Sequence, residues 1–173
     1  MSIFDELNRQ QTQLTELLAD CQGQLQRDQK ELAFVTFQLI SNKLVACMRA
    51  EHATVYPRFE REAKLVSEIA QARQQHDAIE TVITRLRVGN LSRLAWRVEL
   101  AKLAELVEQH QELEEYILFP MAALTFSTEQ LARIGADFLA HLAMATTVAD
   151  AAITYESATF EPPPTPIVRF EAA

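Results

Sequence analysis

The sequence is poor in the residues that interrupt helices. Its 173 residues include three glycines and six prolines, and four of the prolines stand in the last stretch, 157–173. No proline lies between Pro57 and Pro120. Glycine and proline are the weakest helix formers, and 49% of the residues are hydrophobic. The composition therefore favours long helices around a sizeable core, within a single domain.

Basic residues are also scarce. Lysine and arginine number 16 against 24 aspartates and glutamates, which gives a formal net charge of -8. Such a charge repels the phosphates of nucleic acids and anionic lipids, so we expect neither as a partner. No apolar run approaches the roughly 18 residues that span a membrane. The opening residues 1–11 lack the basic and apolar regions of a signal peptide. We expect a cytoplasmic protein in which Cys21 and Cys47 are reduced thiols.

The spacing of apolar residues predicts a succession of helices, at about 3–26, 29–60, 63–88, 92–124 and 128–155. Ser2 with Asp5, and Ser127 with Gln130, have the spacing of N-terminal capping boxes. Pro57 must kink or end the second helix.

The expected fold is therefore all-α. It consists of an up-down-up-down four-helix bundle over residues 1–126, an additional C-terminal helix packed on the bundle over 127–156, and an extended or disordered proline-rich tail over 157–173.

Several side chains with metal-ligand chemistry fall within the apolar stripes of these helices. His110 and Glu114 lie one turn apart, and Glu51 and His76 occupy inward positions on the second and third predicted helices. Glu80 stands at the edge of the stripe that contains His76. A buried carboxylate is costly unless it is paired, and a metal ion can neutralise it while also binding the imidazoles. Mixed nitrogen and oxygen ligands favour iron or manganese, and zinc is also suited.

The inward pattern occurs twice in the chain. Cys47-x3-Glu51-x4-Tyr56-Pro57 matches His110-x3-Glu114-x4-Phe119-Pro120. In a four-helix bundle the second and fourth helices lie diagonally opposite, so each presents the same pattern to the centre. Two carboxylates placed in this way are suited to bridging a pair of cations.

Three groups of residues carry a resemblance to a known family: His76; His110-x3-Glu114-Glu115 with Phe119-Pro120; and Glu51 before Tyr56-Pro57. Over about residues 3–125, the chain resembles the hemerythrin-like HHE cation-binding domain. The resemblance implies a non-haem di-iron site with Glu51 and Glu114 as bridging carboxylates. It also implies that His76 and His110 are terminal ligands of one iron, with Glu80 completing the set.

Two positions depart from the family pattern. Histidines on the first and second helices of the family align with Cys21 and Cys47, and both would be terminal ligands of the second iron. The two cysteines can be thiolate ligands, can form a redox-responsive disulfide, or can pack as small buried hydrophobes beside a half-site without metal.

The leading functional expectation is non-haem binding of iron, as a single ion or a di-iron pair. The role would be oxygen-, redox- or iron-responsive, with O2 or another small oxidant as partner, and a homodimer is compatible with the sequence. The sequence indicates no substrate pocket, so binding is favoured over catalysis. The alternative is a metal-poor helical scaffold or interaction module, with a Cys21–Cys47 disulfide or plain packing at the former site.

Overall fold

The structure is a computed structural model that describes residues 2–88 and 91–159, with side chains of the last helix described as far as residue 145. Within these residues the fold is all-α, as expected. The α-helices are α1 (Ile3–Gln26), α2 (Lys30–Ala50), α3 (Tyr56–Phe59), α4 (Val66–Arg87), α5 (Arg93–Leu113), α6 (Phe119–Thr125) and α7 (Thr128–Thr159). Two π-helical turns interrupt the series: η1 (Glu51–Val55) and η2 (Glu114–Leu118).

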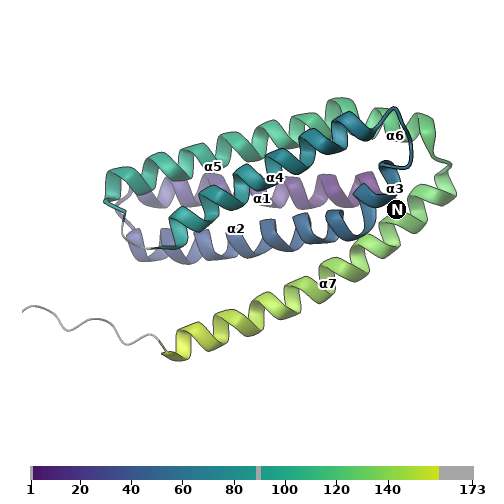
Figure 1. Ribbon diagram of the computed structural model, residues 1–173. Helices are drawn as coiled ribbons and strands as arrows, with labels where there is room; N and C mark the ends of the chain where they lie inside the picture. The colour runs from purple at the N-terminus through teal and green to yellow at the C-terminus, as the bar shows by residue number, and fades with distance from the viewer. Residues whose placement is uncertain (1, 89–90, 160–173) are drawn as a thin grey trace, which may run out of the picture.

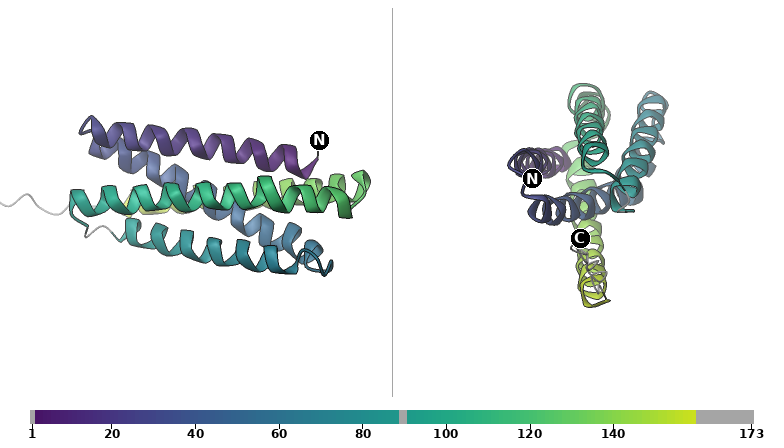
Figure 2. Two further views of the ribbon diagram at one scale, coloured as in Figure 1. Left: turned by 90° about the horizontal axis from the view of Figure 1, so that it is seen from above. Right: turned by 90° about the vertical axis from the view of Figure 1, so that its left-hand side faces the viewer.

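The four long helices α1, α2, α4 and α5 lie side by side along one axis, and each runs back along the one before it (Figures 1 and 2). α1 contacts α2 and α5, and α4 contacts the same two helices from the other side. As a result α2 and α5 lie on one diagonal of the group. The short helices α3 and α6 lie together at one end.

Capping side chains fix where several helices begin. The Ser2 hydroxyl accepts a hydrogen bond from the Asp5 backbone N–H, and the Asp5 carboxylate accepts one from the Ser2 N–H. Ser127 and Gln130 form the same reciprocal pair before α7. Each box satisfies backbone donors that have no partner within the helix, so both predicted capping boxes are confirmed.

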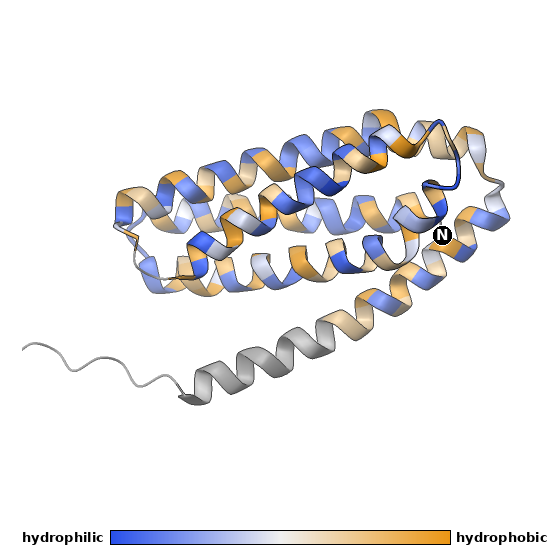
Figure 3. Cartoon of the chain, viewed as in Figure 1, coloured by the Kyte–Doolittle hydropathy of each residue, from blue (hydrophilic) through white to orange (hydrophobic). Residues whose placement is uncertain are grey.

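The buried side chains form two apolar clusters, one at each end of the four long helices. One contains Tyr56, Phe59 and Phe138, and the other contains Phe37, Leu86 and Leu103. Figure 3 shows hydrophobic and hydrophilic bands alternating along the long helices, as expected of helices that pack on one side. Fully burying one large apolar side chain stabilises the fold by roughly 1.5–3 kcal/mol. Between the two clusters lies a layer of polar residues.

α7 crosses the outside of the group and contacts α1, α2 and η1 (Figure 1). Its buried residues Leu131, Ile134 and Phe138 recur at helical spacing on one face. α7 continues to Thr159, so residues 157–159, which the sequence assigns to the tail, are helical. The rest of the predicted tail lies outside the described residues.

One continuous helical stretch, Lys30–Phe59, is long and apolar enough to cross a membrane by length and composition. This differs from the expectation that no stretch approaches that limit. Half of its most apolar window is buried inside the molecule, as in the core helix of a bundle. The stretch is therefore weak evidence for a membrane span.

Candidate metal centre

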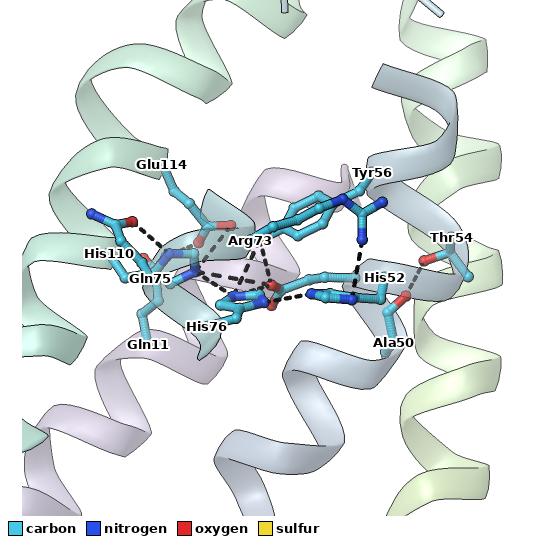
Figure 4. Close-up of polar contacts among 11 residues, drawn as sticks. Gln11, Ala50, His52, Thr54, Tyr56, Arg73, Gln75, His76, His110 and Glu114 are labelled. Atoms are coloured by element: carbon cyan, nitrogen blue, oxygen red, sulfur yellow. Dashed lines mark hydrogen bonds and ion pairs between the residues drawn. The ribbon is translucent and has the colours of Figure 1, made fainter. Parts of the chain in front are cut away.

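Four polar side chains form a buried layer between the two apolar clusters: Glu51, His76, His110 and Glu114. Their exposed fractions are 4%, 2%, 8% and 3%. Glu51 begins η1, His76 lies on α4, His110 lies near the end of α5, and Glu114 begins η2. The structure therefore brings together the four inward ligand candidates that the helical spacing predicts. Figure 4 shows His76, His110 and Glu114 among them.

Three members of the buried layer present their ligand atoms to one point. His76 Nε2 lies 3.0 Å from His110 Nε2. Glu51 Oε2 lies 3.1 Å from His76 Nε2 and 3.9 Å from His110 Nε2. Two ligand atoms about 2.1 Å from one cation and at a right angle are about 3 Å apart. The spacing of this Glu-His-His group, whose ligand atoms all lie within 4.8 Å of one another, fits one metal ion.

Glu114 completes the buried layer from the end of α5, which lies diagonally opposite α2, the helix that precedes Glu51. Its Oε1 lies 3.6 Å from His110 Nε2, and its Oε2 accepts a hydrogen bond of 2.7 Å from Gln11 of α1. Gln11 thus holds one carboxylate oxygen while the other faces His110.

The two π turns place both glutamates at equivalent backbone positions. The Tyr56 N–H bonds to the Glu51 carbonyl, and the Phe119 N–H bonds to the Glu114 carbonyl, five residues earlier in each case. A proline follows each of these donors, and a proline ring clashes with the carbonyl four residues before it. The wider turn relieves that clash, and π turns occur frequently at functional sites.

The π turns also change which residues face inward. Leu118 is buried, whereas Ile117, which the regular helical spacing places in the apolar stripe, is 43% exposed. A regular helix that places His110 and Glu114 inward predicts the same position for Ile117, and that prediction is wrong because the π turn shifts the helical register after Glu114.

Burial controls the charge of the layer. It raises the pKa of Glu51 to about 8 and holds the pKa of Glu114 well above its ordinary range. It also lowers the pKa of His76 to about 4 and that of His110 well below its usual value. In the described part of the chain, no lysine or arginine forms an ion pair with either carboxylate. A cation is the component that would let both carboxylates ionise, so the donor set fits a metal.

Tyr56 covers one side of the Glu-His-His group. Its hydroxyl donates to Glu51 Oε2 at 3.1 Å and lies 3.2 Å from His76 Nε2. Burial and the neighbouring Glu51 carboxyl raise the pKa of Tyr56 well above its ordinary value, so the phenol keeps its proton. The hydroxyl is therefore available as a donor at the edge of the centre.

His52 belongs to the centre, although the sequence pattern directs it to solvent. Because His52 follows Glu51, helical spacing places it off the apolar stripe and predicts that it faces solvent. That prediction is wrong, because His52 Nε2 lies 2.9 Å from His76 Nδ1 and Arg73 Nη1 lies 3.1 Å from His52 Nδ1. One residue after Glu51, the ring lies against α4 instead of pointing away from the bundle (Figure 4). Helical spacing identifies only the residues at the centre of an inward helix face. It therefore does not identify His52, whose ring lies at the border of that face.

The two cysteines differ in their surroundings. Both are free and buried. Cys47 lines a cavity of about 30 Å³ together with Glu51 and the two histidines, enough space for about two waters. Cys21 packs in the apolar cluster, and its Sγ donates to the Ala33 carbonyl at 3.2 Å. Burial raises the pKa of Cys21 to about 11 and also raises that of Cys47. Ligation by either thiol stays a prediction.

Glu80 lies outside the buried layer. It is exposed, and its neighbour Ile79 takes the buried position on α4 with an exposed fraction of 1%. Glu80 instead lines a shallow surface groove with Arg49 and His52. The structure therefore does not bring Glu80 to the Glu-His-His group.

Comparison with protein-family models gives a match over most of the chain. The family model described as hemerythrin HHE cation binding domain matches residues 2–122. No curated protein and no solved structure matches the chain. The matched range contains the four long helices, both π turns and every member of the buried layer.

Proposed function

The chain belongs to the hemerythrin HHE cation-binding domain family, and from that premise we propose that it binds iron in a non-haem centre with an oxygen-, redox- or iron-responsive role. The observation that carries the proposal is the Glu-His-His group, buried on three helices and, among the described residues, without a lysine or arginine in an ion pair with it. Burying two carboxylates beside neutral imidazoles costs several kcal/mol unless a cation compensates them. Zinc or manganese would fit the same ligand types.

Glu51, His76 and His110 would hold the first ion. Glu114 faces them across the layer, and Cys47 borders the same cavity, so a second ion would draw on these two residues. Iron held by these residues would supply a redox-active centre able to bind O2 or another small oxidant. We also propose that the four long helices form the up-down-up-down bundle of the family.

Neighbouring residues prepare the ligands. The Gln75 side-chain oxygen lies 3.1 Å from His110 Nδ1, so it accepts the proton there and leaves His110 Nε2 free to bind. Tyr56 and Gln11 donate to one oxygen of Glu51 and of Glu114, respectively. These bonds orient the carboxylates before any ion arrives.

A cytoplasmic location and the absence of nucleic-acid and membrane partners are part of the proposal. The net charge of -8 and the two free thiols support them.

A metal-poor scaffold is the second candidate. Its support is Cys21, which packs as a small hydrophobe where the family resemblance implies a ligand. Under this alternative the buried layer is a neutral hydrogen-bonded network, and protein purified without added metal contains none.

Metal analysis of the purified protein, together with thiol titration before and after reduction, tests the proposal. We expect one or two irons per chain and two free thiols. Glu51→Ala should lose most of the metal, because it removes a ligand of the Glu-His-His group. Glu115→Ala is the matched control, since Glu115 is an exposed glutamate beside the layer, and it should retain the metal. Metal-free protein that takes up no added Fe(II) would establish the scaffold instead.

A further inference from the structure

A chain of hydrogen bonds runs from the surface into the buried layer. Glu60 binds Arg73 through two contacts, at 2.8 and 3.2 Å. Arg73 Nη1 lies 3.1 Å from His52 Nδ1, and His52 Nε2 lies 2.9 Å from His76 Nδ1. The other ring nitrogen of His76 faces the metal centre. Figure 4 shows Arg73, His52 and His76 in this order.

The chemistry of arginine gives this chain a direction. A guanidinium only donates hydrogen bonds, so His52 Nδ1 must accept. A neutral imidazole carries one proton, which places the proton of His52 on Nε2, where it is donated to His76 Nδ1. The proton of His76 then lies on Nε2, the nitrogen that faces Glu51 and His110.

The contacts of His110, at the end of the network away from Arg73, require the same direction of hydrogen-bond donation. The Gln75 amide oxygen accepts from His110 Nδ1, while the amide nitrogen faces the Gln109 carbonyl at 3.4 Å. His110 Nε2 therefore carries no proton and accepts the one on His76 Nε2, at 3.0 Å. In this arrangement each ring accepts one hydrogen bond, at His52 Nδ1, His76 Nδ1 and His110 Nε2, so all three rings are neutral.

The two histidine ligands, His76 and His110, consequently differ in whether they can bind a metal ion without first moving a proton. His110 presents a lone pair to the centre, whereas His76 presents a proton. His76 can bind a metal only as the other tautomer. In that change the His52 Nε2 proton passes to His76 Nδ1, the His76 Nε2 proton leaves to water, and water supplies one proton to His52 Nδ1. Both rings are neutral before and after, and no net proton is released.

The exchanged tautomer conflicts with Arg73, because the new N–H of His52 points at a guanidinium N–H. We propose that Arg73, acting through His52, is a positioning residue that holds His76 in the tautomer unable to bind metal and separates from His52 when His76 binds. This inference rests on the proposed function, since it takes His76 as a ligand. Arg73 therefore competes with the metal ion, because each favours a different tautomer of His76. Metal binding is in this way coupled to the ion pair of Arg73 with Glu60 at the surface.

Arg73 is placed to make this movement. The Arg73 and Glu60 side chains are 33% and 38% exposed, so water can replace the contact with His52. The guanidinium also lies 5.2 Å from the centre of the Tyr56 ring, which gives it other partners after release. Glu60, the partner of Arg73, directly follows α3. A movement of Arg73 would therefore affect the end of the bundle where α3 and α4 meet.

Zinc binding to Arg73 variants tests the inference, with Zn(II) as the probe and affinity measured by competition with a chromophoric chelator. Arg73→Gln should tighten Zn(II) binding roughly three- to tenfold, the scale of one hydrogen bond, because an amide can also accept from His52. The same substitution also removes a positive charge. The control is therefore Arg73→Gln in a His52→Gln background, where the relay is cut and the gain should largely disappear.

The tautomers provide a second readout that does not depend on affinity. Nitrogen NMR of the histidine rings should show the His52 proton on Nε2 in metal-free protein and on Nδ1 with Zn(II). Equal gains from Arg73→Gln in both backgrounds, or an unchanged His52 tautomer with Zn(II), would overturn the inference and leave the proposed function standing. Absence of both Zn(II) and Fe(II) binding by the wild type and by every variant would overturn both.

Discussion

Glu51 and His76 give the metal-free protein opposite pH dependences. The folded state binds a Glu51 proton that the unfolded chain has lost, so this contribution is full below pH 4.5 and is lost as the pH rises to about 8. His76 acts in the other direction, because its contribution is present above pH 6.5 and is lost as the pH falls to about 4. Of these two contributions, only that of Glu51 still changes above pH 6.5.

We therefore expect metal-free protein to lose stability from pH 6.5 to pH 8, by up to about 2 kcal/mol for one proton. Glu114 changes in the same sense, because its pKa is also raised. Urea unfolding in the presence of a chelator measures the effect. Glu51→Gln should make the decline shallower, and a decline as steep as in the wild type would show that Glu51 does not cause it.

For single residues, the sequence predicts which side chains lie at the centre of each inward helix face, but not which side chains at its border turn inward. Glu51, His76, His110 and Glu114 are correctly assigned inward because they continue an apolar stripe. His52 and Glu80 each stand one residue from a stripe position, where spacing does not decide the outcome. The imidazole of His52 contacts His76, whereas Glu80 stays exposed because its neighbour Ile79 takes the buried position on α4.

Among the elements, the π turns are the part of the site that the sequence indicates least directly. Pro57 predicts an interruption of the second helix, whereas the predicted helix over 92–124 runs through Pro120 without one. Regular helical spacing cannot show that each interruption is a wider turn beginning at a glutamate. For that reason the register is correct as far as Glu114 and fails at Ile117.

The contact between α7 and the start of α1 depends on Gly135. A Cβ at Gly135 would lie 3.1 Å from the Ile3 backbone nitrogen and 3.2 Å from its Cα, atoms that cannot move away independently. A Cβ at Gly23 would meet only the flexible guanidinium of Arg27, at 3.3 Å. Both glycines lie within helices, where alanine is favoured by about 1 kcal/mol.

We expect Gly23→Ala to stabilise the protein by roughly 0.5–1 kcal/mol, as helix propensity predicts. Gly135→Ala should give no gain or a loss of about 1 kcal/mol, because crowding against α1 offsets the propensity. Chemical unfolding of the two variants measures the difference. Equal stabilisation by both substitutions would mean that α7 does not approach α1 this closely in solution.

For the whole molecule, the buried layer separates two apolar clusters that would otherwise meet. Its ligand atoms come from three chain segments that are distant in sequence: η1, α4 and α5 with η2. The sequence predicts the all-α class and the main helices because periodicity and caps are local signals. The path of α7 across α1, α2 and η1 depends on contacts between distant segments, which local patterns do not encode.

Because its ligands join separate helices, a bound ion should stabilise the entire fold. At a free Fe(II) or Zn(II) concentration of 100 times Kd, mass action adds about 2.7 kcal/mol. For a chain of this size that corresponds to a rise in Tm of roughly 5–11 °C. Scanning calorimetry of metal-free protein, with and without added ion, measures the shift. Glu115→Ala should show the full rise and Glu51→Ala little of it. A full rise in Glu51→Ala would place the ion elsewhere in the molecule.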